Sequence, residues 1–546
     1  MAEVNFRFRE KTQSYRFTSE LSSFMHKSLP REYLLSGYGL LRKFDPKLIK
    51  QGLEYLQPDN FRMLIVSRDF PGTWELKEKW YGTEYTCQPI PAELMDEIQK
   101  AAAAAPGDRT TKLHLPHKNE FVPINLEVGK TDVKEPTLAP RIIRDDSHVR
   151  TWFKKDNTFR VPKVTFIISC RSPVATASAA NRVKLRLFTD LVMDALEEYS
   201  YDAKLAGLES TVSPDSRGLT IKVSGYNDKL SVLLRRVLIT TRDLEIRDDR
   251  FAIIKERISR GYRNWELAAP YTQINYYMWW LTIDRNYVAE ELQDELPHIT
   301  ADAVRVFQKE LLAQMHMEVL AHGNINKEDA LKLTDIVEST LKPRALPRQQ
   351  WKIRRELILP PGSNYIWKKK LKDPANVNHC IQYLLHIGRG DYDVRAKTLL
   401  LQQIIEEPCF SQLRTKEQLG YTVYSGAWTS ITQYGFYFVI QSEKTALYLE
   451  TRIEEFLKTV AKTLEEMSDA EFKSNKRSII DKRLERLKYM EQESNRYWNH
   501  IHTELYAFDN GTSTLTQDLS PDTNLIFPLV QPSKTQTTSC FSPSPT

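Results

Sequence analysis

Hydrophobic and polar residues follow the same succession of patterns in two stretches of the chain, and the first stretch begins near residue 164. Val164 to Ser169 is a short apolar run that predicts a strand, and apolar residues at i, i+3 and i+4 predict a helix over 181–200. Apolar and polar residues then alternate over 219–223, which is the period of a half-buried strand. A long charged helix is expected to begin at Asp248.

The second stretch repeats this order later in the chain. Apolar residues alternate over 381–387, a helix is predicted over 393–407, and another alternating strand follows over 436–440. Gly207 and Gly420 occupy equivalent places 213 positions apart. A repeat of this length, with the same order of elements, indicates a duplicated structural unit.

Each unit is predicted to end in a helix followed by a strand. This succession occurs over 45–66, where Phe61 to Val66 would form the strand, and again over 302–322. The chain would therefore hold the end of one unit, one full unit, and a third that lacks its final helix and strand. Residues beyond Phe508 are polar and rich in Ser, Thr and Pro through Thr546, so we expect a disordered tail. Alternating strands and helices predict an α+β fold, with mainly antiparallel sheets covered by helices.

Composition narrows the class of protein only slightly. The chain has 546 residues, of which 41% are hydrophobic and 27% charged, which is typical of globular domains. A net charge of +6 among 77 basic and 71 acidic residues gives no reason to expect nucleic-acid binding. We expect no signal peptide, because no N-terminal stretch combines a basic flank, an apolar run and a small-residue cleavage site. We expect no membrane span either, because no run of about 18 apolar residues occurs.

The cysteines suggest a reducing environment. Their number is odd, they lie far apart, and no CxxC pair occurs. This pattern favours reduced thiols in a cytoplasmic protein over disulfides or a cysteine-based zinc site. The five residues are Cys87, Cys170, Cys380, Cys409 and Cys540.

The histidines predict no metal site. Neither HExxH nor HxxEH occurs, and His114 and His117 are separated by a proline without a suitably placed glutamate. His500 and His502, on a helix predicted to begin around Tyr497, are two positions apart and should point to different faces. His322 is expected to be a turn residue at the end of a strand. No nucleophile elbow or P-loop is present either, so the chain shows no complete catalytic set.

The strongest polar cluster lies between Pro408 and Tyr421. A helix carrying Arg414 is expected to end at Gly420 in the left-handed conformation, and Tyr421 would begin a strand nearby. A guanidinium and a phenol in this arrangement could donate to a carbonyl that gains negative charge. Alternatively, Arg414 pairs with Glu417 and Tyr421 packs into the sheet, and spacing alone favours this second interpretation.

A basic helix follows, and a capping-box pattern predicts its start at Ser468. Its basic residues include Lys482, Arg483, Arg486 and Lys488. Such runs are most often solvated faces, and the other hypothesis is an anion or nucleotide site.

Several segments resemble the C-terminal half of insulysin-type zinc peptidases, the pitrilysin/insulinase family. The strongest is "EPCFSQLRTKEQLGYTVYSG" (Glu407 to Gly426). Others are "SGYNDKLSVLLRRVL" (Ser224 to Leu238), "IQSEKTALYLETRIEEFL" (Ile440 to Leu457) and "YWNHI" (Tyr497 to Ile501). The resemblance covers about residues 3 to 508, in order.

This resemblance implies the C-terminal half of a clamshell of four αβ-roll domains. The implied boundaries are 1–118 for the remnant of a second domain, 119–145 for a linker between halves, 146–358 for a third domain, 359–508 for a truncated fourth domain, and 509–546 for a low-complexity tail.

The resemblance also implies site residues. Arg414 and Tyr421 match the family's donors to the substrate carbonyl. The resemblance therefore favours the donor role over the interpretation in which Arg414 pairs with Glu417 and Tyr421 packs into the sheet. The family's polyanion or nucleotide site corresponds to Glu485 to Glu491, where Leu487 and Tyr489 depart from the pattern. Zinc is the cofactor of the intact family enzyme, and none is expected on this chain.

The implied activity is zinc-dependent hydrolysis of short unfolded peptides. The chain would supply the substrate-enclosing half and would be inactive alone. Its expected partner is an N-terminal catalytic half or a full-length homologue, and a homodimer is also possible. Two alternatives stay open: a non-catalytic peptide-binding subunit, and a truncated gene model of a full-length peptidase.

Overall fold

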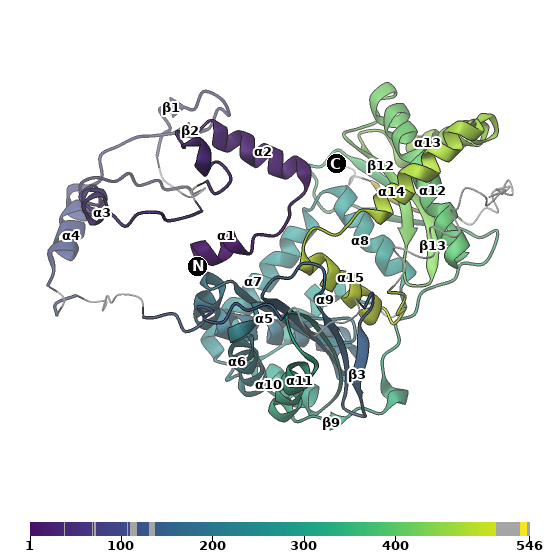
Figure 1. Ribbon diagram of the computed structural model, residues 1–546. Coiled ribbons are helices and arrows are strands. Elements are labelled where there is room, and N and C mark those ends of the chain that lie inside the picture. The colour runs from purple at the N-terminus through teal and green to yellow at the C-terminus, as the bar shows by residue number, and fades with distance from the viewer. Residues whose placement is uncertain are drawn as a thin grey trace. The chain divides into compact units, whose positions relative to one another are not determined.

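The computed structural model describes residues 1–37, 39–67, 69, 72–105, 107–109, 117–129, 137–284, 286–508 and 536–542 (Figure 1). The chain divides into two compact units. A small unit comprises Ala2–Arg7 and Ser19–Glu120, and a large unit comprises Met1, Phe8–Thr18 and Phe121–Thr546. No helix in the described part of the chain combines the length and hydropathy that crossing a membrane requires.

The small unit contains short helices and one two-residue strand pair, and its described residues are mostly exposed. Its elements are α1 (Ala2–Arg7), the end of α2 (Ser14–Met25), α3 (Pro46–Leu53), β1 (Leu76–Lys77), β2 (Glu84–Tyr85) and α4 (Ala92–Ala103).

The strand predicted over 61–66 is not formed, although the preceding helix is confirmed as α3. A strand needs a neighbouring backbone for its hydrogen bonds, and the only ladder among the described residues of this unit is the two-residue pair β1–β2. The apolar side chains of this segment are left in solvent, with Leu64 87% and Val66 86% exposed.

The first sheet of the large unit has the strand order β3-β4-β8-β5-β7-β6, with β9 beside β8. Its pairs are antiparallel except β4–β8 and β8–β9. The predicted strands at 164–169 and 219–223 are confirmed as parts of β5 and β7. The bounds are β3 (Arg141–Asp145), β4 (Val149–Lys155), β5 (Lys163–Arg171), β6 (Leu208–Pro214), β7 (Gly218–Tyr226), β8 (Gln314–Gly323) and β9 (Arg344–Ala345).

Helices pack against one face of this sheet. Phe166 and Ile168 of β5 lie in one buried cluster with Leu187 of α5 and Phe307 of α10. The predicted start of α7 at Asp248 is confirmed, and the helix predicted over 181–200 lies within the longer α5, which the side chain of Ser178 caps. The helices of the first repeat, of which α8 lies away from this sheet, are α5 (Ala179–Leu205), α6 (Leu230–Asp243), α7 (Asp248–Glu266), α8 (Pro270–Thr282), α9 (Ala289–Glu295), α10 (Ala301–Ala313) and α11 (Lys327–Leu341).

The second sheet has the order β10-β14-β11-β13-β12. Its strands are β10 (Asn364–Lys370), β11 (His379–Arg389), β12 (Thr422–Thr429), β13 (Gln433–Ser442) and β14 (Gln536–Ser542). The helices are α12 (Tyr392–Cys409), α13 (Ala446–Glu466), α14 (Asp469–Leu484) and α15 (Met490–His502). The order corresponds to β4-β8-β5-β7-β6 of the first sheet, which has β3 and β9 in addition. The predicted duplication, with its α+β fold and mainly antiparallel sheets, is therefore confirmed.

The prediction that the second repeat lacks its final strand is wrong. The backbone of β14 pairs in parallel with β10 and antiparallel with β11, as β8 does with β4 and β5 in the first sheet. A segment without strong hydrophobic periodicity can fill this place because two neighbouring strands offer it backbone hydrogen bonds on both sides. The rest of the predicted tail, 509–535 and 543–546, lies outside the described residues.

The two repeats exchange one helix each (Figure 1). Helix α8 of the first repeat packs on β11, β13 and β14, and α15 of the second packs on β5 and β8. Ile274 and Tyr277 of α8 join a buried cluster of the second sheet, whereas Tyr497 and Ile501 of α15 pack on the first. Each repeat therefore covers part of the sheet of the other.

Candidate functional site

The predicted donor Arg414 lies on a wide helical turn that follows α12. Pro408 has no backbone N–H, so it cannot donate the usual helical bond to the carbonyl four residues earlier. Two residues later the winding changes from α to π, over Phe410–Lys416. A π turn inside an α-helix often marks a functional site. Leu413 is fully buried and anchors the turn, while Arg414 next to it is half-buried.

The end of this helix differs from the prediction. Gln418, not Gly420, adopts the left-handed conformation, with φ of 52°. Position 420 requires glycine for a different reason: a Cβ there would lie 2.0 Å from the carbonyl oxygen of Gln441. The junction between the π turn and β12 therefore presses directly against β13. Tyr421 immediately precedes β12, which begins at Thr422.

The Arg414 guanidinium lies between two aromatic rings. It is 4.6 Å from the ring centroid of Phe410 and 4.8 Å from that of Tyr421. Both rings reach solvent, with exposed fractions of 43% for Phe410 and 88% for Tyr421. The interpretation in which Tyr421 packs into the sheet and Arg414 pairs with Glu417 is wrong.

The Glu417 carboxylate instead binds Arg452 of α13. Arg452 donates to both carboxylate oxygens, from Nε at 2.7 Å and from Nη2 at 2.8 Å, and Gln412 donates at 2.8 Å. The hydrogen bond from Arg452 is the main reason why the pKa of Glu417 lies below its ordinary value. No described carboxylate forms an ion pair with Arg414, so its donors remain available for an acceptor from outside.

Sequence reasoning had missed two of these residues. Phe410 lies four positions before Arg414, a spacing that places side chains side by side on a helix, so it could have been found. Arg452 lies on a helix beyond two strands, and no local pattern connects it with Glu417.

The second candidate site is a basic cavity of about 350 Å³ in the large unit. Six basic side chains and one carboxylate, Glu485, are among its lining residues. The basic residues are Arg395, Lys482, Arg483, Arg486, Lys488 and Arg496. The structure therefore brings the four basic residues named from sequence to one cavity, where Arg395 and Arg496 join them.

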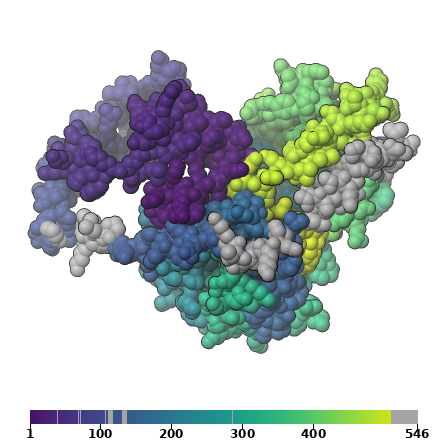
Figure 2. All heavy atoms as spheres, viewed as in Figure 1, coloured from purple at the N-terminus to yellow at the C-terminus, as the bar shows by residue number. Residues whose placement is uncertain are grey.

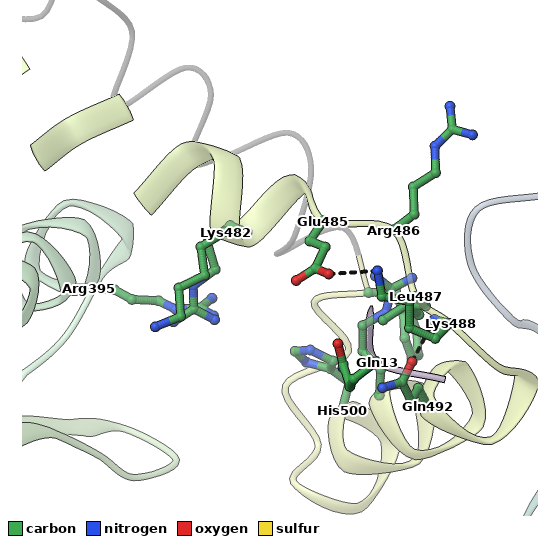
Figure 3. A pocket seen from close by; sticks show the side chains of 12 residues that line it. Gln13, Arg395, Lys482, Glu485, Arg486, Leu487, Lys488, Gln492 and His500 are labelled. Atoms are coloured by element: carbon green, nitrogen blue, oxygen red, sulfur yellow. Dashed lines mark hydrogen bonds and ion pairs between the residues drawn. The ribbon is translucent and has the colours of Figure 1, made fainter. Parts of the chain in front are cut away.

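This cavity lies at the end of the basic helix, which is shorter than predicted. The capping box at Ser468 is confirmed, but α14 ends at Leu484 and the chain then turns toward α15. The turn lies on the surface of the large unit, in the yellow part of the chain (Figure 2). Figure 3 shows Arg486 pointing away from the other side chains.

The charges of the cavity are only partly compensated. Lys488 pairs with Glu485 at 2.7 Å. Desolvation, and after it repulsion from Arg395, lowers the pKa of the Arg483 guanidinium below its ordinary value. An excess of mutually repelling cations is typical of a place that binds an anion.

The histidines do not gather into a metal site. Among the described residues, no group of three or more His, Cys, Asp or Glu side chains is placed to hold a metal ion. His502 contacts Asp215 and Arg217 while His500 lines the basic cavity, so their predicted divergence is confirmed. Their helix begins at Met490, well before the predicted start at Tyr497. Of the pair His114 and His117, the first lies outside the described residues.

His322 is not the predicted turn residue. It is fully buried within β8, where its Nε2 lies 3.1 Å from a carboxylate oxygen of Glu493 and its Nδ1 lies 2.8 Å from Ser494. Glu493 and Ser494 belong to α15, the exchanged helix. Lys154 of β4 lies 3.4 Å from the same carboxylate. These contacts bring the pKa of Glu493 down to about 2, against the opposing effect of burial.

Comparison with known proteins gives a consistent result. The sequence profile described as the middle or third domain of peptidase M16 matches residues 6–295, and that of PQQ synthase PqqF-like, C-terminal lobe domain 4, matches 400–498. Insulin-degrading enzyme from Homo sapiens is 35% identical, and the match covers 93% of this chain and 49% of that protein. The A-factor-processing enzyme of Saccharomyces cerevisiae is 32% identical, with the same two coverages of 93% and 49%.

The fold is also that of a solved peptidase. The crystal structure of pitrilysin superposes with a TM-score of 0.77 at 22% identity, over 99% of this chain and 56% of that one. The chain spans about half the length of the curated relatives it matches. It belongs to the M16 peptidase family and corresponds to the C-terminal half of an insulysin-like member.

Proposed function

We propose that this chain is the substrate-enclosing half of an M16 zinc metallopeptidase that hydrolyses short unfolded peptides. Its relatives support this substrate class, since they include an insulin-degrading enzyme and an A-factor-processing enzyme. The observation that carries the proposal is the pair formed by Arg414 and Tyr421, an exposed phenol beside a guanidinium that no described carboxylate neutralises.

The two side chains would act on the carbonyl of the scissile peptide bond. When a nucleophile attacks this carbonyl, negative charge develops on its oxygen. Arg414 offers N–H donors and a permanent positive charge, and Tyr421 offers an O–H donor. Donors that are already in place when the charge develops stabilise the transition state more than the ground state.

The zinc of the family does not fit this chain, because its described residues provide no ligand group. The metal would be held by an N-terminal half on the same or another polypeptide. The small unit supports such a partner, since the apolar residues of 61–66 are exposed in a row and contiguous apolar surface is typical of an interface. We further propose that 146–358 and 359–508 are the third and fourth domains of the assembled enzyme.

Cytoplasmic residence is also proposed. Cys87, Cys170, Cys380 and Cys409 all occur as free thiols, and the last three are buried. Reduced cysteines are the rule in the cytoplasm.

The test is reconstitution with the zinc-bearing N-terminal half of an M16 relative and an unfolded fluorogenic peptide. We expect the mixture to cleave the peptide and the chain alone not to. Arg414→Ala should lower kcat by about 100-fold, as the loss of a preorganised donor does, and Tyr421→Phe by about 10-fold. Lys416→Ala, an exposed cation on the same π turn, serves as the matched control and should leave kcat unchanged.

Two outcomes would change the proposal. If Arg414→Ala and Tyr421→Phe both cleave at the unaltered rate, the donor role is wrong. If the chain binds the N-terminal half and the peptide but no cleavage follows, a non-catalytic peptide-binding subunit becomes the better description.

The basic cavity supports a second function, binding of a polyanion or nucleotide. The supporting observation is its charge, six basic side chains against one carboxylate. Calorimetry with tripolyphosphate and ATP should detect binding that weakens as salt increases. Arg483→Gln should reduce the affinity by about 5- to 10-fold, whereas Lys473→Gln, outside the cavity on the same helix, should not. Equal affinities for both variants would rule out this cavity as the site.

A further inference from the structure

Glu417 is a carboxylate close to Arg414 along the chain. It follows Arg414 by three positions, a spacing at which opposite charges in an α-helix commonly pair. Yet the carboxylate accepts hydrogen bonds from Arg452 and Gln412, and the Arg414 guanidinium contacts only aromatic rings among the interactions described for it. The acid next to the proposed donor is therefore occupied elsewhere.

The position of Arg452 is fixed by the packing of α13. Leu449 and Ile453, its neighbours on that helix, are completely buried in the core of the second repeat. The two hydrogen bonds from Arg452 engage both oxygens of Glu417, and a bidentate pair of this kind has a defined geometry. Glu417 is mostly buried, with 16% of its side chain exposed, so few other cations can reach it.

We propose that Arg452 is a positioning residue: by engaging Glu417, it keeps the guanidinium of Arg414 unpaired and stacked between Phe410 and Tyr421. Without Arg452, the carboxylate would lose its strongest partner and become free to pair with Arg414, three positions before it. The effect on Arg414 is a property of this chain alone. Only its consequence for peptide hydrolysis rests on the proposed function.

A purely structural role is the competing explanation, in which Arg452 simply ties the π turn to α13. The two explanations differ in what happens when Glu417 is also neutralised. If Arg452 acts by restraining the charge of Glu417, Glu417→Gln should rescue Arg452→Leu. If Arg452 acts as a tie, the double variant lacks the tie as well and should stay defective.

The first arm of the experiment measures Arg414 on the isolated chain. Phenylglyoxal modifies accessible guanidinium groups, and peptide mapping by mass spectrometry gives the rate at Arg414. We expect Arg452→Leu to slow this modification by about 3- to 5-fold, the population change that an exposed ion pair produces. Arg452→Leu with Glu417→Gln should return to within about 2-fold of the original rate. Arg477→Leu, which removes an exposed pair with Asp481, is the control and should change nothing.

The second arm measures kcat in the mixture with the N-terminal half. Arg452→Leu should lower kcat, and the double variant should recover it. If the modification rates behave as expected but kcat does not respond, the positioning role stands and the proposed catalytic function of Arg414 fails.

Two results would overturn the inference: an unchanged modification rate in Arg452→Leu, or a double variant as slow as the single one. If Arg452→Leu does not fold, Arg452→Lys replaces it. Lysine keeps the charge but loses the bidentate geometry, so an intermediate rate at Arg414 is expected and an unchanged rate counts against the inference.

Discussion

Glu493 should be one of the residues on which the exchange of helices between the repeats depends. It lies on α15 of the second repeat, and its carboxylate contacts His322 and Lys154 from the sheet of the first repeat. Its side chain is only 8% exposed and that of Lys154 only 1%. Replacing Glu493 by Gln therefore leaves a buried ammonium without its counter-ion.

The contribution of Glu493 to the free energy of unfolding follows from its pKa. The folded chain brings it from 4.5 to about 2, which at 1.36 kcal/mol per pH unit corresponds to about 3 kcal/mol of stabilisation near neutral pH. Breaking a buried ion pair by removing one partner typically costs about 3–5 kcal/mol, which agrees. A depressed carboxyl pKa means that the contribution is present above pH 4.5 and is lost as the pH falls from 4.5 toward 2.

His322 adds to the loss in acid. Burial lowers its pKa below the ordinary value of 6.5, so the folded state resists protonation of the imidazole. The contribution of His322 to the stability of the folded chain is fully present above pH 6.5 and is lost progressively as the pH falls below 6.5. Both groups thus predict that α15 loosens from the first sheet as the solution becomes acidic.

Hydrogen exchange of the peptide covering α15 measures this directly. At pH 7, Glu493→Gln should speed exchange of α15 by about 100-fold, and the difference from the unaltered chain should shrink below pH 4.5. The matched control is Glu491→Gln on the same helix. Glu491 pairs with Lys222 but is 51% exposed, so its loss should cost less than about 1 kcal/mol. If the two variants accelerate exchange equally, the buried cluster does not hold α15 in the way argued.

Two further predictions concern local geometry. Gly420→Ala should lower the melting temperature and shift Tyr421, because the new Cβ would meet Gln441 at 2.0 Å. Gly261→Ala inside α7 should stabilise the chain by up to about 1 kcal/mol, because its Cβ would meet nothing within 4 Å. Equal effects of the two variants would contradict this reasoning. Ser468→Ala removes the capping box of α14 and should cost about 1 kcal/mol in urea unfolding, while the exposed Ser474→Ala on the same helix should be nearly neutral.

The sequence predicted the repeated elements well, because their patterns are local. The alternation over 219–223 and the helical spacing over 181–200 depend on which side chains face a core, and each lies within one element. The strand β14 was missed because its place depends on two partner strands far away in sequence. The strand predicted at 61–66 failed for the opposite reason, since a suitable pattern has no partner there.

The candidate sites show the same limit. Arg414 and Tyr421 could be named because both lie in one short segment, and so could the basic residues from Lys482 to Lys488. Their surroundings could not be predicted: the exchanged helix that buries Glu493 and the helix that brings Arg452 to Glu417 come from other parts of the chain. Pairing across the core determines which charges are neutralised, and no local spacing encodes it.

Comparison of the repeats shows how the junction that carries Arg414 and Tyr421 differs from its counterpart in the first repeat. With the offset of 213 positions between Gly207 and Gly420, Pro408 corresponds to Ala195, so α5 continues without interruption to Leu205. Tyr421 corresponds to Leu208, which is fully buried, whereas Tyr421 is 88% exposed. The equivalent helix therefore ends differently in the two repeats. In the first repeat it stays a regular helix that closes over the core. In the second it continues into a π turn that presents a guanidinium between two rings. The duplicated scaffold is therefore common to both repeats, and an exposed phenol beside a guanidinium distinguishes the helix–strand junction of the second.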